Sequence, residues 1–149
     1  MRDRTTDLHE TAALRLSGVE QRYTRGRRAL VSVLAAADAP LAIPQLLERA
    51  PGLAQSSAYR NLTVLERAGI VHRIVTSDEF ARYELAEDLT GHHHHLICST
   101  CGEVRDFTMP PGVESEIDRA LGAIAGRHSF AADHHRLDLV GTCARCAAR

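Results

Sequence analysis

The chain has 149 residues, 44% of them hydrophobic and 4% aromatic, with 18 Arg, no Lys and a net charge of -1. This length allows one ordinary domain or two small ones, and the lack of Trp leaves little surface for stacking single-stranded nucleic acid. No apolar run approaches the roughly 20 residues needed to span a bilayer, and residues 1–10 lack the apolar segment of a signal peptide. We therefore expect a cytoplasmic protein without membrane contact.

The charge is unevenly distributed. Residues 1–86 contain 12 Arg and 10 acidic residues, a net charge of +2, whereas residues 87–149 contain 6 Arg and 9 acidic residues, a net charge of -3. Two halves with different partners would show this distribution. The global charge by itself argues neither for nor against DNA binding.

The first half predicts helices. After a short helix within residues 7–16, apolar residues at helical spacing predict a helix over 25–37. A short helix follows with Pro44 in its first turn, and another is expected to begin near Ser56, a good capping residue, and to end at Gly69. Short helices connected by tight turns indicate a helix-turn-helix.

Two β-prone runs follow, over residues 70–76 and 80–86, and Ser77-Asp78-Glu79 between them indicates a hairpin. A helix-turn-helix followed by a two-stranded hairpin is the winged-helix plan. Residues 87–91 are polar and turn-like, and we place a hinge there.

The second half predicts strand, strand, helix and strand. Strands are expected over residues 92–98 and 103–108, and a last strand over about 134–140. Pro110-Pro111-Gly112 begins a helix whose apolar stripe is Val113, Ile117, Ala120, Leu121, Ile124 and Ala125. We therefore predict an α+β fold with a winged-helix domain at 1–86, a hinge at 87–91 and a small α/β domain with a three-stranded sheet at 92–149.

Four cysteines form two CxxC pairs, Cys98–Cys101 and Cys143–Cys146, with 41 residues between them. A tetrahedral zinc ion needs two such turns brought together, so the spacing predicts a structural Zn2+ site. The alternatives are two disulfides or a redox CxxC. A redox CxxC usually begins a helix, whereas each pair here follows a predicted strand.

Four consecutive histidines precede the first CxxC. Because strand side chains alternate, His93 and His95 should face one side and His92 and His94 the other. Histidine is a common metal ligand, so one segment could supply two metal sites. The alternative is a solvated histidine tract.

Candidate partners for each pair lie on other predicted elements. For His93 and His95 they are His72 and Glu84, in the hairpin, and for His92 and His94 they are Glu114 and His135. The alternative interpretations are an exposed strand histidine at His72 and ordinary surface carboxylates at Glu84 and Glu114.

With these residues in place, the chain resembles the ferric uptake regulator family of metal-dependent bacterial repressors, which includes zinc, nickel and peroxide sensors. The resemblance covers about residues 22–146, and its most specific stretches are SSAYRNLTVLERAGIV, HHHHLICSTCGEV and HRLDLVGTCARC. It implies a winged-helix domain joined to an α/β dimerisation domain, with a homodimer that binds a double-stranded DNA operator with an inverted repeat. No small-molecule substrate is implied.

The resemblance also implies roles for the candidate ligands. The cysteines correspond to the family's structural zinc site, and a regulatory site maps to His72, Glu84, His93 and His95. An additional site within the dimerisation domain maps to His92, His94, Glu114 and His135.

The ligand pattern departs from the family in two places. Iron-type members often supply a histidine from the loop corresponding to Pro40-Leu41-Ala42, where this chain has none. Zinc sensors often have a cysteine near the position of Glu84, and this chain has none there either. A histidine in the hairpin, such as His72, is similar to the pattern of the zinc-sensing members. Histidine-rich tetrahedral coordination suits Zn2+, whereas Fe2+ is expected to need more oxygen ligands.

The family's DNA contacts come from its third helix and a basic N-terminal segment. The corresponding residues here are Arg22, Arg25, Arg27, Arg28, Ser56, Ser57, Tyr59 and Arg60. Arginines can contact phosphate or a guanine edge, and serines at a helix N-terminus favour phosphate. The alternatives are a core role for Tyr59 and a solvated helix face for the arginines.

These observations favour a zinc-sensing repressor of metal-uptake genes and leave several alternatives. A sensor of ferrous iron or of peroxide would share the architecture, and a zinc store or chaperone would bind metal without recognising DNA. A zinc hydrolase is disfavoured because the histidines lack the helical HExxH arrangement and no nucleophilic constellation of Ser, His and Asp is present.

Overall fold

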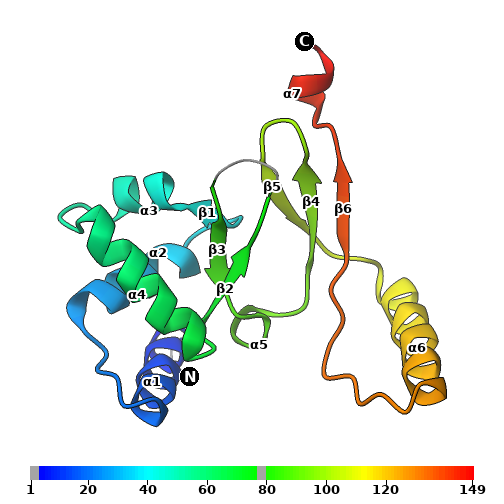
Figure 1. Cartoon of the computed structure of the whole chain (residues 1–149), viewed down its shortest axis with the longest axis horizontal. Helices are drawn as coiled ribbons and strands as arrows, with labels where there is room; N and C mark the ends of the chain where they lie inside the picture. Colours follow the sequence, from blue (N-terminus) through cyan, green and yellow to red (C-terminus); the bar gives the residue numbers. More distant parts are fainter. Residues whose placement is uncertain (1–3, 77–79) are drawn as a thin grey trace.

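The computed structural model describes residues 4–76 and 80–149. The predicted turn at Ser77-Asp78-Glu79 lies outside these residues. Two three-stranded sheets divide the molecule, with helices α1 to α4 on one side and helix α6 on the other (Figure 1). In the described part of the chain, no helix is both long and apolar enough to cross a membrane.

The N-terminal half is built on four helices, which are α1 (Arg4–Gly18), α2 (Arg25–Ala35), α3 (Ile43–Arg49) and α4 (Gln55–Arg67). Their apolar faces meet in one core, and its fully buried leucines are Leu16, Leu30, Leu46, Leu62 and Leu65. Helix α1 is longer than predicted. His9 lies 2.5 Å from the Tyr23 hydroxyl and so connects α1 to the segment before α2.

Helix α4 begins before the predicted cap. The Ala54 carbonyl accepts the first helical hydrogen bond, from the Ala58 N–H at 2.9 Å, so Ser56 lies inside the first turn rather than at its cap. After α4 the chain passes through Gly69, whose φ of +70° is readily adopted by glycine, as the sequence predicted for the helix end.

The first sheet has one strand more than predicted. Strands β2 (Val71–Ile74) and β3 (Arg82–Leu85) form the predicted antiparallel pair, shorter at both ends, and β1 (Leu41–Ala42) pairs with the other edge of β3. Two residues give too little pattern to predict a strand. Both are buried, and the order is β1-β3-β2.

The predicted hinge contains a single helical turn, α5 (Glu87–Thr90), rather than an irregular segment. Arg15 of α1 donates to the Gly69 carbonyl at 2.5 Å and forms an ion pair with Asp88 of α5. The hinge is therefore tied to the first helix.

The second sheet has the order β5-β4-β6, with strands β4 (His94–Cys98), β5 (Val104–Phe107) and β6 (Asp138–Gly141). Strand β4 is antiparallel to β5 and parallel to β6. The predicted strands at 92–98 and 134–140 are shorter in the structure, and a short helix, α7 (Ala144–Ala147), was not predicted. Register places Asp106 of β5 and Asp138 of β6 on either side of His95.

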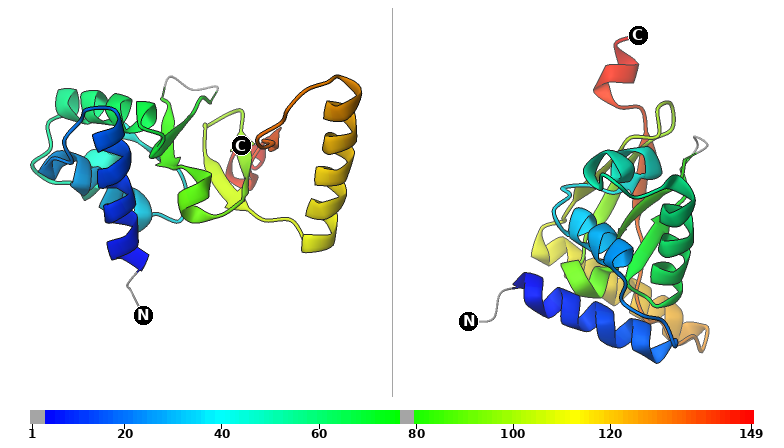
Figure 2. Two further views of the ribbon diagram at one scale, coloured as in Figure 1. Left: turned by 90° about the horizontal axis from the view of Figure 1, so that it is seen from below. Right: turned by 90° about the vertical axis from the view of Figure 1, so that its left-hand side faces the viewer.

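Helix α6 (Pro111–Arg127) stands away from the rest of the chain, as a second view shows (Figure 2). None of its residues is buried. Its apolar stripe is instead exposed, with Val113 at 44%, Leu121 at 39% and Ile124 at 43%. A helix with an apolar stripe is expected to pack against something, but no other part of the described residues, 4–76 and 80–149, buries this stripe.

Candidate metal sites and DNA-facing helix

The four cysteines converge at the end of the second sheet. All four thiols are free, and their sulfur atoms lie within 4.8 Å of one another. We call Cys98, Cys101, Cys143 and Cys146 the cysteine group. The Sγ atoms of Cys101 and Cys143 are 3.9 Å apart, close to the edge of about 3.8 Å that follows from tetrahedral zinc with Zn–S bonds of about 2.3 Å.

Backbone amides favour thiolate in the cysteine group. The Cys143 N–H donates to the Cys98 sulfur at 3.3 Å, and backbone hydrogen bonds from Cys143 and Cys101 lower the pKa of Cys98 to about 6. Because thiolate is the form that binds metal, the geometry and the donors fit a zinc ion. A disulfide would require sulfur atoms about 2 Å apart.

A second group spans the hinge. Glu84 comes from β3, His93 and His95 from the start of β4, and Asp106 from β5, with one ligand atom of each within 4.8 Å of the others. We call these four residues the hinge group. The Nε2 atoms of His93 and His95 lie 2.9 and 3.1 Å from one oxygen of Glu84.

The charges in the hinge group support one another. Burial acts to raise the pKa of Glu84, but its hydrogen bonds with the rings of His95 and His93 hold that pKa below its ordinary value. Burial likewise opposes the protonation of both histidines, yet the pKa of His93 is raised by the Gly91 carbonyl and Glu84. Glu84 and Asp138 raise the pKa of His95. The carboxylate form of Glu84 and the protonated form of the two rings therefore stabilise each other.

The structure differs from the sequence prediction at the fourth position of the hinge group. His72 lies across from Glu84 on β2, and its buried Nε2 has no hydrogen-bond partner among the described residues. It lines a cavity of about 500 Å³ together with Glu84, His93 and His95. It does not join their cluster, whose fourth member is Asp106 of β5.

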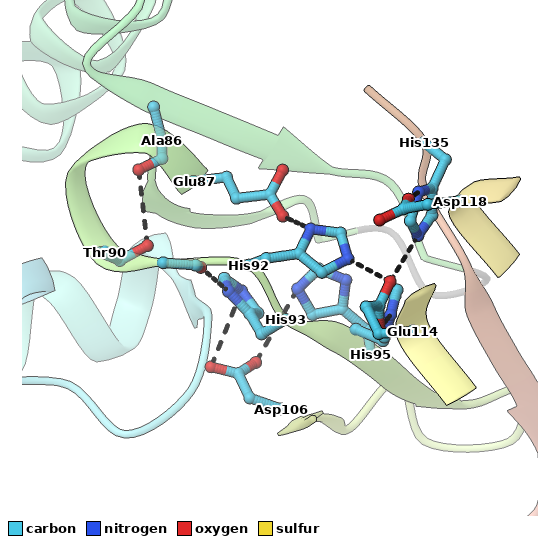
Figure 3. Close-up of polar contacts among 12 residues, drawn as sticks. Ala86, Glu87, Thr90, His92, His93, His95, Asp106, Glu114, Asp118 and His135 are labelled. Atoms are coloured by element: carbon cyan, nitrogen blue, oxygen red, sulfur yellow. Dashed lines mark hydrogen bonds and ion pairs between the residues drawn. The ribbon is translucent and has the colours of Figure 1, made fainter. Parts of the chain in front are cut away.

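Sequence reasoning missed Asp106. Its carboxylate is 3.8 Å from His95 Nε2 and 4.0 Å from His93 Nε2, as the close-up shows (Figure 3), and burial raises its pKa. The signal was available, since a hairpin of the predicted strands around the CxxC turn places Asp106 directly across from His95.

The third group lies between the start of β4 and α6. His92, His94, Glu114 and His135 each offer one ligand atom within 4.8 Å of the others, and we call them the additional group. The Nε2 atoms of His92 and His94 are each 2.9 Å from a different Glu114 oxygen, and that of His135 is 3.0 Å away. His94 is only 1% exposed.

The predicted alternation of the histidine tract is therefore confirmed in geometry. His93 and His95 face the hinge group, whereas His92 and His94 face the additional group. Figure 3 shows His93 and His95 beside Asp106, and His92 beside Glu114. In both groups imidazole nitrogens and carboxylate oxygens point toward a common centre. These donors suit zinc and other divalent transition metals.

The residues predicted to contact DNA differ in their solvent exposure and in their contacts within the chain. Tyr59 is 48% exposed, so it is not a core residue. Arg22, Arg25, Ser56 and Arg60 are also exposed, and Arg28 lies over the Tyr23 ring at 5.0 Å. Ser57 is partly buried.

Arg27 is used within the chain. Its guanidinium donates to the Asn61 side chain at 3.2 Å, the Arg22 carbonyl at 2.6 Å and the Gln21 side chain at 3.0 Å. These bonds attach the segment before α2 to α4.

Comparisons with known proteins agree with this arrangement. The sequence profile of the Ferric uptake regulator family matches residues 19–140. The chain is 31% identical over 97 residues to the peroxide operon regulator of Bacillus subtilis, covering 65% of this chain and 61% of that protein.

Solved structures show the same fold. The ferric uptake regulator of Helicobacter pylori superposes with a TM-score of 0.75 at 23% identity, covering 96% of this chain and 93% of the other. A zinc-bound manganese uptake regulator superposes with a TM-score of 0.63 at 31% identity, covering 91% of this chain and 98% of the other.

Proposed function

Since the chain belongs to the ferric uptake regulator family and is thus a metal-responsive transcriptional regulator, we propose that it is a homodimeric, zinc-dependent repressor of metal-uptake genes. In this proposal residues 1–86 bind DNA, residues 87–91 form the hinge, and residues 92–149 form the dimer and bind metal. The cell compartment of its action is the cytoplasm.

The hinge group carries the proposal. Glu84 lies on β3 of the first sheet, whereas His95 and Asp106 lie in the second sheet and His93 directly precedes it, so a metal held by all four would connect the two halves. Such a connection stabilises one relative orientation over the others. A ligand shifts a conformational equilibrium only through that kind of difference.

Zinc is the metal that we propose for all three groups. Each contains four donors, and zinc in proteins prefers four ligands drawn from thiolate, imidazole and carboxylate. The cysteine group would hold structural zinc, and the hinge group would sense it. For the additional group, three imidazoles and one carboxylate also fit zinc.

The dimer is supported by the exposed apolar surface of the C-terminal half. The stripe of α6 is uncovered, and Leu139 and Val140 on the edge strand β6 are 61% and 62% exposed. A second copy would bury both surfaces. Two copies would also present two α4 helices to the half-sites of an inverted repeat.

On DNA, we propose that α4 approaches the major groove. Exposed Tyr59 and Arg60 would reach base edges or phosphate, and Ser56 would contact phosphate. Arg22 and Arg25 would add phosphate contacts beside it. Arg27 would act indirectly, by holding their segment against α4.

A sensor of ferrous iron or peroxide is the second candidate. Two observations favour it, namely the second carboxylate that Asp106 contributes to the hinge group and the similarity to a peroxide operon regulator. The predicted set with His72 contained one carboxylate, whereas the hinge group contains two, and ferrous iron is expected to favour the set with more oxygen ligands.

Operator binding across metals tests the choice. Fluorescence anisotropy with DNA from upstream of metal-uptake genes, at buffered free zinc and, under anaerobic conditions, free ferrous iron, should show tight binding with zinc. Tight binding with iron alone would favour the second candidate, and peroxide treatment of that form, followed by mass spectrometry of the histidines, would identify a peroxide sensor. A protein that binds metals yet never binds DNA would contradict the repressor and point to a metal store.

A further inference from the structure

Carboxylates that belong to neither the hinge group nor the additional group contact the Nδ1 atoms of histidines in those groups. A histidine that binds metal through Nε2 leaves Nδ1 free to hydrogen-bond elsewhere. Three such nitrogens face carboxylates, namely His95 with Asp138, His135 with Asp118 and His92 with Glu87. These carboxylates come from β6, α6 and α5, so the arrangement is not a by-product of one turn.

The contact between His95 and Asp138 is the best defined. The two residues are register partners on parallel strands β4 and β6, and His95 Nδ1 lies 3.1 Å from Asp138 Oδ1. His95 is 6% exposed, so its ring has little access to water as an alternative partner. Its other nitrogen, Nε2, lies 3.1 Å from Glu84 in the hinge group.

The contact between His135 and Asp118, an ion pair, has a similar distance in the additional group. His135 Nδ1 lies 3.1 Å from Asp118 Oδ1, and its Nε2 lies 3.0 Å from Glu114. Asp118 differs in its surroundings, since its side chain is 64% exposed against 32% for Asp138. Solvent weakens the more exposed contact.

The chemistry of these contacts fixes the imidazole tautomer. An ionised carboxylate can only accept hydrogen bonds, so the Nδ1 that faces it must carry a hydrogen. The lone pair of the neutral ring is then on Nε2, the nitrogen that faces the metal-binding centre. Such a contact also fixes the plane of the ring and raises its basicity.

We propose that Asp138 and Asp118 are positioning residues that set the metal affinities of the hinge and additional groups, respectively. The inference rests on the proposed function, because it takes both groups to be metal sites. It adds residues that bind no metal themselves and lie on β6 and α6, which both carry exposed apolar side chains. Metal affinity is thereby linked to the elements proposed to form the dimer.

Each site can be measured in a variant that lacks the other. Glu114→Ala leaves the hinge group intact, and Glu84→Ala leaves the additional group intact. Zinc affinity is measured by competition with a chromophoric chelator on protein whose cysteine group is already loaded. Asp138→Ala in the Glu114→Ala background should weaken zinc binding by about 10–100-fold. Asp138→Asn, which keeps an acceptor but loses the charge, should weaken it less.

The two aspartates serve as matched controls for each other. Asp118→Ala should leave the hinge affinity unchanged, and in the Glu84→Ala background it should weaken the additional site by less than Asp138→Ala weakens the hinge site, because Asp118 is more exposed. Asp133→Asn, at an exposed carboxylate that lines the hinge cavity, should change neither affinity.

Long-range proton–nitrogen spectra of the histidine rings add a readout that a purely structural role would not alter. His95 should show a protonated Nδ1 in the zinc-loaded protein and lose this preference in Asp138→Ala. Zinc bound at the cysteines alone in the wild type would overturn the proposed function and this inference with it. Wild-type zinc binding that Asp138→Ala leaves unchanged in affinity and tautomer would overturn this inference alone.

Discussion

At the scale of the residue, one alternation determines the chemistry of the C-terminal half. Consecutive histidines point to opposite sides, so His93 and His95 reach Glu84 while His92 and His94 reach Glu114. Shifting the tract by a single position would exchange the two sets, because the side-chain period of a strand is two. The sequence was therefore sufficient to divide these side chains between the two groups.

Replacing His93 tests the hinge group most simply. His93→Ala removes an imidazole beside Glu84 and leaves the cysteine group and α6 untouched, so structural zinc and the dimer should persist. Affinity for operator DNA should lose its dependence on zinc. Anisotropy titrations with and without zinc, alongside zinc content and sedimentation, provide the check, and a zinc response equal to that of the wild type would contradict the assignment.

The hinge group should also bind metal less tightly in acid. The pKa values of His93 and His95 are raised, so below those values the rings hold protons that must leave before metal binds. Apparent zinc affinity should therefore rise as pH increases through that range. Chelator competition on the Glu114→Ala variant between about pH 5.5 and 8 measures the slope. A pH-independent affinity would mean that these rings are not ligands.

At the scale of the element, short connections hold the parts of the molecule together. Arg15 attaches α1 to the hinge helix α5, and the two CxxC turns bring α7 to the end of β4. Neither connection relies on a large apolar contact, since α5 and α7 have no buried residue. Their positions therefore depend on polar contacts and, in the case of α7, on the proposed zinc ion.

Loss of the cysteine group should therefore release the C-terminus. Cys143→Ser removes a thiolate from the proposed tetrahedral site, so zinc content should fall and amide hydrogen exchange in residues 144–147 should accelerate. Exchange in α2 and α4, which belong to a separate core, should stay as in the wild type. Unchanged zinc content would show that the four sulfur atoms do not act as one site.

Loss of the Arg15 contact should have a small effect on stability. The Asp88 side chain is 63% exposed, and an exposed ion pair contributes about 0–1 kcal/mol. Asp88→Asn should therefore lower the free energy of unfolding in urea by no more than about 1 kcal/mol. Its effect should shrink with added salt, and a larger, salt-independent loss would contradict a surface role.

The elements were more predictable than the contacts between them. Periodicity identified helices α1 to α4 and α6 and the principal strands, because apolar spacing reports which face is buried. It could not identify β1, whose two residues carry no period. Nor could it exclude His72 from the hinge group, because that depends on how the two sheets come together, which brings Glu84 of β3 into one group with His93 and His95 but not His72 of β2.

At the scale of the whole molecule, the account rests on two halves and one connection. The N-terminal half has a large core of its own, whereas the C-terminal half buries few apolar residues within the chain and exposes those of α6 and β6. A dimer would supply the missing burial. The hinge group would then determine how far apart the two DNA-binding halves lie.

The distance between those halves is the measurement that tests this central claim most directly. A spin label introduced through an unnatural amino acid at Glu48, an exposed residue of α3, would give a single label-to-label distance in the proposed homodimer. Double electron–electron resonance should give a narrow distance distribution with zinc, a broad one when the cysteine group alone is loaded, and a broad one for His93→Ala under both conditions. A wild-type distribution that has the same width with and without zinc at the hinge group would contradict the account.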